Sequence, residues 1–215
     1  MTELTRLSNG LTVVTDTMAH VDSAAIGVWV KAGARTERAG EHGVAHFLEH
    51  MAFKGTHRRT ARQISETIEA VGGEINAATS IETTAYHARV LADDVPLALD
   101  ILSDIVTDPL FAEDDIGREC NVILQEIGAA EDIPEDRAFD AFPETAFARQ
   151  PVGRRILGTR DSVGSMDGAR LRGFFERTYA PAAMTVAAAG AVDHDAFAAA
   201  VEAAFPSAAQ GADAA

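Results

Sequence analysis

Apolar and polar positions follow two periods along the chain, one typical of β-strands and one typical of α-helices. Strands are predicted over SNGLTVVTD (8–16), SAAIGVWVKAG (23–33) and AAMTVAAAG (182–190), because these stretches are rich in strand-forming residues and begin or end at turn residues. EINAATSIETTAYHARVLA (74–92) predicts a pair of strands. Because strands and helices follow one another in mixed order, the sequence predicts an α+β fold.

Helical spacing is clearest from about residue 41 to residue 53, where Val44, Phe47, Leu48 and Met51 are apolar and Gly55 ends the segment. Further helices are predicted over residues 60–73, 93–109, 166–179 and 193–205, and a long one begins near Glu113. Thr60 is the expected N-cap of the first of these, and Gly72–Gly73 its stop.

The last residues, PSAAQGADAA, have the composition of a linker and no apolar periodicity. We therefore predict one domain over residues 1–206, followed by an interdomain linker or tail over 207–215. No apolar run approaches the roughly 18 residues of a membrane span, and the start MTELTRLSNGLTVV has no signal-peptide pattern. A single cysteine, Cys120, excludes an internal disulfide framework, so a bacterial cytoplasmic location is expected.

The formal net charge of −15 limits the partners that the protein can bind. It repels nucleic-acid phosphates, and there is no basic stripe with interleaved aromatic residues, so nucleic-acid binding is not expected. Basic peptides would be attracted to such a surface.

The stretch HFLEH, residues 46–50, contains the chemistry of greatest interest. On a helix His46 and His50 lie one turn apart on the same face, with Glu49 at its edge. Two imidazoles can begin a zinc site, but zinc takes four ligands, or three and a water. A third protein ligand must therefore come from elsewhere in the chain.

The long helix offers that ligand. Its apolar stripe is formed by Ile116, Cys120, Ile123 and Ile127. Glu119 and Glu126 are seven residues apart and share a face beside this stripe. Because a buried carboxylate is costly without a partner or a metal, Glu126 is the candidate third ligand.

Three blocks, HFLEHMAFKGT, NAATSIETTAYHA and RECNVILQEI, resemble the M16 metallopeptidases, the group of mitochondrial processing peptidase, pitrilysin and insulin-degrading enzyme. The signature of that family is the inverted motif HxxEH, followed about 76 residues later by a glutamate ligand, and Glu126 lies 76 residues after His50. The resemblance implies a mixed, largely antiparallel sheet packed with helices, and a zinc-dependent endopeptidase activity.

The resemblance also implies a role for each site residue. His46, His50 and Glu126 would be the zinc ligands, and Glu49 the general base for the water that the metal activates. Glu119 would orient a ligand imidazole by accepting its distal N–H.

Four more residues are implied to meet substrate. Asn76 and Ala77 match an edge strand that binds extended peptides main chain to main chain. Phe53 and Tyr86 would line the substrate groove, with core packing an equally good alternative.

Other candidates for the metal site are weaker. His42 lies roughly 12 Å from His50 along a helix, too far to share one ion, and is expected to be exposed. His57 is assigned to a loop and His87 to a strand. A cysteine accompanies HxxEH in the related S-ribosylhomocysteinases, but Cys120 falls on the apolar stripe and is expected in the core. The acidic run around residues 131–136 is typical of a solvated face, although it could favour basic peptides.

Most bacterial relatives contain two homologous halves, and this chain matches the first, zinc-binding half. In the family the second half supplies an arginine and a tyrosine that hold substrate and stabilise the tetrahedral intermediate. The chain is therefore expected to be a piece of a longer protein or a half-length subunit, and to need a C-terminal half or a partner subunit for full activity. The alternative is a non-catalytic binding or scaffold subunit.

Overall fold

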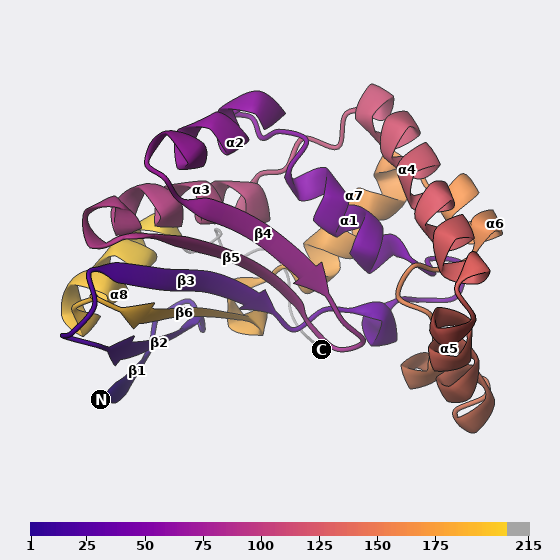
Figure 1. The fold of residues 1–215 in the computed structure, drawn as a ribbon, viewed down its shortest axis with the longest axis horizontal. Helices are drawn as coiled ribbons and strands as arrows, with labels where there is room; N and C mark the ends of the chain where they lie inside the picture. Colours follow the sequence, from indigo (N-terminus) through magenta and orange to yellow (C-terminus); the bar gives the residue numbers. More distant parts are fainter. Residues whose placement is uncertain (206–215) are drawn as a thin grey trace.

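A six-stranded sheet, with the strand order β1-β2-β6-β3-β5-β4, organises the computed structural model, which describes residues 1–205 (Figure 1). Its strands are β1 (Thr2–Arg6), β2 (Thr12–Thr17), β3 (Ser23–Val30), β4 (Glu74–Thr79), β5 (Thr84–Leu91) and β6 (Met184–Gly190). The β2–β6 pair is parallel and the other four pairs are antiparallel. The predicted mixed, largely antiparallel α+β fold is confirmed.

The helices are α1 (Val44–Ala52), α2 (Ala61–Ala70), α3 (Val95–Thr107), α4 (Glu113–Asp132), α5 (Pro134–Ala146), α6 (Arg160–Gly164), α7 (Gly168–Thr178) and α8 (His194–Ala204). Thr60 caps α2 by accepting a hydrogen bond from the Gln63 amide, as predicted. Helix α3 packs against β3 and β5, α8 against β2, and α1 against β4, α4 and α7.

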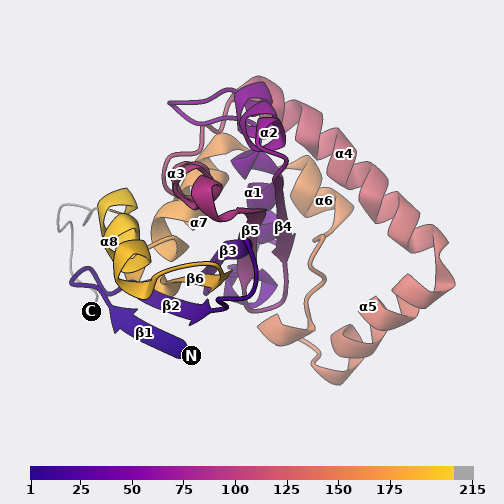
Figure 2. The ribbon, with the colours of Figure 1, turned by 60° about the vertical axis from the view of Figure 1, so that its left-hand side comes forward.

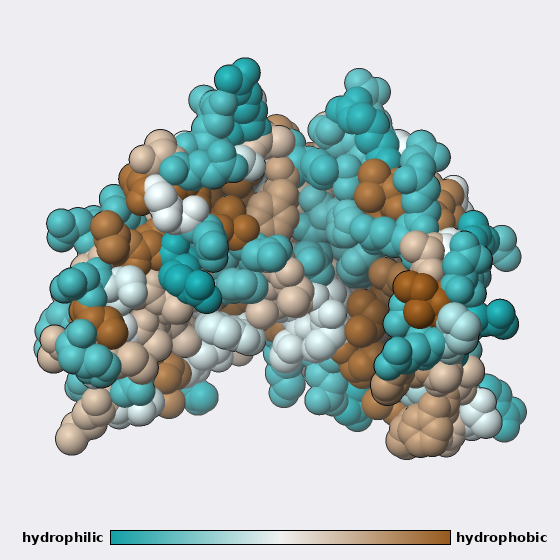
Figure 3. Space-filling model, viewed as in Figure 1, coloured by the Kyte–Doolittle hydropathy of each residue, from teal (hydrophilic) through white to brown (hydrophobic). Residues whose placement is uncertain are grey.

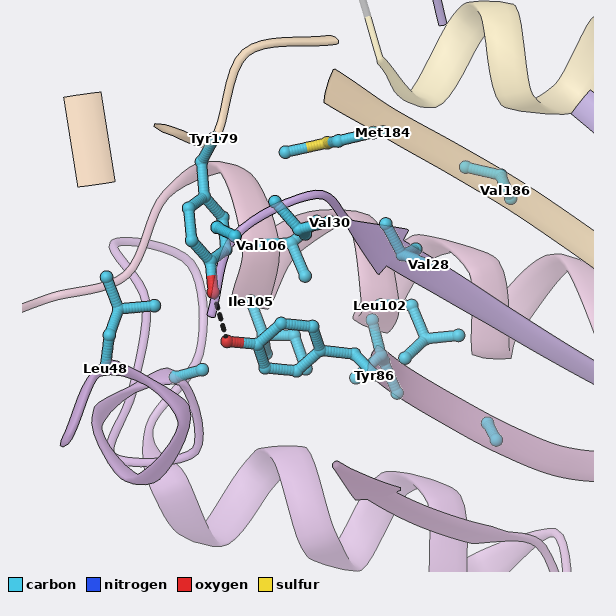
Figure 4. Packing of buried hydrophobic residues seen from close by; sticks show 14 of the residues in the cluster. Val28, Val30, Leu48, Tyr86, Leu102, Ile105, Val106, Tyr179, Met184 and Val186 are labelled. Carbon is cyan, nitrogen blue, oxygen red and sulfur yellow. Dashed lines mark hydrogen bonds between the residues drawn. The ribbon is translucent and has the colours of Figure 1, made fainter. Parts of the chain in front are cut away.

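One face of the sheet is buried beneath these helices. Along β5, Tyr86, Ala88 and Val90 are buried, whereas His87 and Arg89 between them are exposed. The alternation follows from the period of two of a strand with one face in the core. In that core the hydroxyls of Tyr86 and Tyr179 form a hydrogen bond of 2.8 Å (Figure 4).

Helices α4 and α5 extend away from the sheet as an arm (Figure 2). α5 has no buried residue, and its Phe139 and Phe142 are 71% and 72% exposed. No core-facing stripe marks this helix, so its sequence pattern gave no prediction of a helix. The same holds for β1, whose Leu4 is 67% exposed.

The predicted linker over residues 207–215 lies outside the described residues, so the domain boundary stays a prediction. Within residues 1–205, the structure contains no helix with the length and apolar character needed to cross a membrane.

The start of α1 is fixed by a close contact between two glycines. Gly43 has a φ of +87°, and a Cβ on it would lie 2.7 Å from the carbonyl oxygen of Leu157. Gly158, also left-handed, packs against His42 in return. Only residues without a Cβ allow the two backbones to approach this closely.

We predict that Gly43→Ala lowers the free energy of unfolding by about 3 kcal/mol, because it adds overlap with Leu157 to the strain of a left-handed alanine. Gly40→Ala is the matched control. Its φ is +85° with nothing within 4 Å of the added Cβ, so it has only the strain, about 1 kcal/mol. Urea unfolding of both variants measures the difference, and equal losses would contradict the contact.

Candidate metal centre

His46 and His50 project from one face of α1 toward Glu126 on α4, so residues far apart in the sequence meet. Helices α1 and α4 pack against each other (Figure 1). The Oε2 atom of Glu126 lies 3.8 Å from Nε2 of His46 and 3.7 Å from Nε2 of His50. One ligand atom of each residue lies within 4.8 Å of those of the other two. The three residues predicted as ligands therefore face one another.

The separations suit one zinc ion. Ligand atoms around a tetrahedral ion with bonds of about 2.1 Å lie about 3.4 Å apart, and the observed 3.7 and 3.8 Å are a few tenths longer. Two imidazole nitrogens and a carboxylate oxygen are a donor set that zinc accepts, with a fourth position open. The residues present fit the metal.

His50 is oriented from behind by Glu119. Its Nδ1 lies 3.0 Å from Oε2 of Glu119, whose side chain is only 7% exposed, and Lys54 places its Nζ 2.6 Å from the other oxygen. A carboxylate that accepts the Nδ1–H leaves the lone pair of Nε2 directed at the metal position. The ammonium of Lys54 offsets the buried negative charge of Glu119, and nothing in the sequence pattern indicated this contact.

His46 is held in its neutral form by its surroundings. Burial, and then the nearby His50, lower the pKa of His46 to about 4. Neutral imidazole is the form that binds metal, so this ligand is available at neutral pH. Its Nδ1 is buried and has no hydrogen-bond partner within residues 1–205, so His46 has no counterpart there to Glu119.

The side chain of Glu49 reaches β4 and lines the same hollow as His46. The hydroxyl of Thr79, the last residue of β4, donates a hydrogen bond to its Oε2 atom. The contact fixes the carboxylate beside the metal position without making it a ligand. Sequence spacing gave no signal for Thr79, because the contact depends on how β4 packs against α1.

The four residues predicted to meet substrate have different surroundings. Asn76 and Ala77 lie on β4, an edge strand whose only partner in the described sheet is β5. Phe53 is half-buried and packs against the core. Tyr86 is 0% exposed and bonded to Tyr179, so its expected place in a substrate groove is wrong in this structure and the core-packing alternative holds.

A hollow of about 430 Å³ adjoins the ligands between β4 and α5. Its walls include His46, Glu49, Thr79, Phe139 and the acidic Asp136 and Asp140. In Figure 3 the surface is hollowed between the sheet and α5, and apolar residues gather over α5. A larger hollow of about 760 Å³ covers the open face of the sheet, but the metal ligands lie outside it, so the chemistry places the site at α1.

The remaining candidates stay outside the site. His57 is exposed in a loop and pairs with Asp108, and His87 is exposed on β5, as predicted. His42 is half-buried rather than exposed, because it packs beside Gly158. Cys120 is half-buried, packs against the core and points its Sγ toward the Val163 carbonyl at 3.5 Å.

A helix with HxxEH, completed by a carboxylate from a second helix, is the arrangement of a zinc metallohydrolase. The model of the family described as Insulinase (Peptidase family M16) matches residues 12–160, and the chain belongs to that family.

Its relatives are named as proteases. A zinc protease of Streptomyces coelicolor is 45% identical over 94% of this chain and 44% of its own length. A mitochondrial-processing peptidase subunit beta of Arabidopsis thaliana is 44% identical over 90% of this chain and 36% of its own. Zinc is thus the metal named for several such relatives, in agreement with the predicted cofactor.

Solved structures share the fold. A protease from Helicobacter pylori superposes with a TM-score of 0.93 at 24% identity, covering 100% of this chain and 52% of its own. The first half of the periplasmic protease PqqL from Escherichia coli gives 0.85 at 26% identity, covering 98% and 48%. The chain spans about half the length of the curated relatives it matches. Because PqqL is periplasmic, the expected cytoplasmic location stays a prediction.

We predict that the chain binds about one zinc, and that His46→Ala, His50→Ala and Glu126→Gln each lower its zinc affinity sharply, because each removes one of three protein ligands. His87→Ala is the control, since that histidine is exposed on β5, outside the ligand cluster. Chelator competition measures the affinities. Full zinc retention in Glu126→Gln would overturn the assignment of the third ligand.

Proposed function

We propose that this chain is the zinc-binding half of an endopeptidase that hydrolyses peptides or unfolded segments. The observation that carries the proposal is the convergence of His46, His50 and Glu126 next to a separately held carboxylate, Glu49. Membership of a peptidase family and the zinc-protease names of its relatives support it.

Each residue has a task in that reaction. His46, His50 and Glu126 would hold zinc, which supplies a Lewis acid that lowers the pKa of a coordinated water to about 7. Glu49 accepts the proton of the attacking water and returns it to the departing amine. Because Thr79 occupies its Oε2, we assign the proton transfer to Oε1.

The edge of β4 is the proposed track for the peptide. An extended segment can add to the unpaired edge of a sheet through main-chain hydrogen bonds. β4 passes Asn76 and Ala77 and ends at Thr79, which contacts Glu49. A peptide paired with β4 would therefore bring its backbone carbonyls to the general base.

The hollow beside Glu49 supports a preference among peptides. Phe139 offers an apolar wall, and Asp136 and Asp140 offer negative charge. A side chain with an apolar stem and a cationic end would satisfy both features. This agrees with the attraction of basic peptides expected from the net charge of −15.

A second homologous half, covalent or added as a partner subunit, would complete the site. The relatives are about twice as long as this chain, and the exposed aromatic residues of α5 beside the hollow are open to a further partner. A non-catalytic binding subunit is the alternative, but the retention of both histidines, Glu49 and Glu126 favours catalysis.

We predict that Glu49→Gln retains zinc but abolishes peptide cleavage in an active assembly, because the amide cannot accept the water proton. Chelator competition and a quenched fluorescent peptide report the two properties separately. Glu66→Gln, on the surface of α2, is a control for charge loss. Loss of zinc from Glu49→Gln would argue against a purely catalytic role, and unchanged cleavage would remove Glu49 from the mechanism.

We predict that adding the second half of a two-half relative, or restoring a native one downstream of Ala215, raises cleavage of an unstructured peptide at least about a hundredfold. Removing one donor to the oxyanion typically costs about 10² to 10³ in rate, and lost positioning adds to this. Zinc affinity should change little. Equal rates with and without the second half would mean that this domain is sufficient by itself.

A further inference from the structure

No side chain at the N-cap position accepts a hydrogen bond from the first amides of helix α1. The N-cap residue is Gly43, which has no side chain, and there is no acidic residue in the first turn. The first amides of a helix need acceptors, and the helix dipole favours a negative charge near them. For the helix that contains HFLEH, both must come from another part of the chain.

Glu37 supplies the acceptors and, when it is ionised, the negative charge. It follows the short helix η1 (Ala34–Thr36) and is only 4% exposed. Its Oε2 accepts a hydrogen bond of 3.0 Å from the Gly43 amide, and its Oε1 accepts one of 3.1 Å from the Ala45 amide. A single carboxylate thus bridges two amides of the first turn, immediately before His46.

Glu37 is itself held in place by a third segment. Arg154, just after the short helix η3 (Pro151–Gly153), donates a hydrogen bond to the Glu37 carbonyl. The same segment continues to Leu157 and Gly158, which pack against Gly43. The start of α1 is therefore clamped between the carboxylate on one side and a glycine contact on the other.

The surroundings of Glu37 include groups that raise its pKa and groups that lower it. Burial raises its pKa to about 8, although the Ala45 and Gly43 amides and the charge of Arg154 lower it. Glu41, on the same loop, raises it further, and Glu41 is itself bound to Arg177 of α7. Both oxygens are hydrogen-bond acceptors here, the arrangement suited to the ionised form.

We propose that Glu37 is a positioning residue that fixes the axial position and rotation of α1, and thereby aims His46 at Glu126 and Glu49 at the end of β4. A helix turns about 100° and rises 1.5 Å per residue. A shift of one residue in the first turn would turn His46 away from a ligand that lies 3.8 Å from it. Metal and catalytic sites tolerate errors of only about 0.5 Å.

The inference rests on the proposed zinc site, but it can be tested without metal. In the metal-free chain, the ¹⁵N–¹H signals of Gly43 and Ala45 should titrate with a midpoint near the pKa of about 8 of Glu37. In Glu37→Gln that titration should disappear. Because the wild-type titration needs no variant, it decides the question even if Glu37→Gln does not fold.

Zinc affinity supplies the second readout. Glu37→Gln keeps one acceptor and resembles the protonated acid, so its affinity should equal that of the wild type at about pH 6.5. At about pH 9, where the wild type is ionised, it should be about tenfold lower or more. Glu37→Asp keeps the charge but cannot span both amides, and should fall between them. Glu41→Gln is the control, because that carboxylate binds Arg177 and the Arg38 amide and not α1.

The outcomes separate the two proposals. A wild-type chain that binds no zinc, yet shows the titration at Gly43 and Ala45, would sink the zinc site and leave the contact of Glu37 with α1. Zinc binding with no titration, or a ratio of affinities between wild type and Glu37→Gln that does not change with pH, would overturn the positioning role. A loss of affinity in Glu41→Gln equal to that in Glu37→Gln would also overturn it.

Discussion

The position of α1 between β4 and α4 is the constraint on which the functional part of this structure depends. The helix has only nine residues, and it must present two imidazoles to one neighbour and a carboxylate to the other. Its buried residues, among them Phe47, Leu48 and Met51, seat it in the core. Since this packing buries one face of the helix, the opposite face can hold the histidines and Glu49.

The carboxylates of Glu119 and Glu49, which lie around helix α1, each have a hydrogen-bond or ion-pair partner. Glu119 accepts from His50 and is itself bound by Lys54, and Thr79 donates to Glu49. Buried carboxylates are costly when alone, and these contacts offset the cost while fixing directions. Glu126 differs, since its side chain is 40% exposed and it faces the two ligand histidines. These contacts hold the side chains around α1, and the site is open toward the hollow between β4 and α5.

The arm formed by α4 and α5 joins a helix that packs in the core to a helix that lies on the surface. Helix α4 is anchored in the core by Ile116, Ile123 and Ile127, while α5 contributes no buried residue. The third predicted ligand, Glu126, lies on the anchored helix. A partner or a peptide that contacts Phe139 or Phe142 would therefore act close to the metal ligands without disturbing the core.

The sequence by itself determined the chemistry of the site and most of the elements. His46 and His50 share a face because of helical periodicity, a purely local property, and Thr60 caps α2 for an equally local reason. Family resemblance supplied the pairing with Glu126, which periodicity alone could only suggest. Elements without a core-facing stripe, β1 and α5, gave no such signal, and the pattern was silent about them.

Only the tertiary structure decided which long-range contacts complete the site. Tyr86 lies on the buried face of β5, and its hydroxyl contacts Tyr179, which is 93 positions away in the sequence. Thr79 contacts Glu49, and Lys54 contacts Glu119. Glu37 contacts the first turn of α1. Each contact forms because separate segments of the chain pack together. Such contacts leave no period in the sequence, because they depend on where two elements meet and not on the spacing within either one.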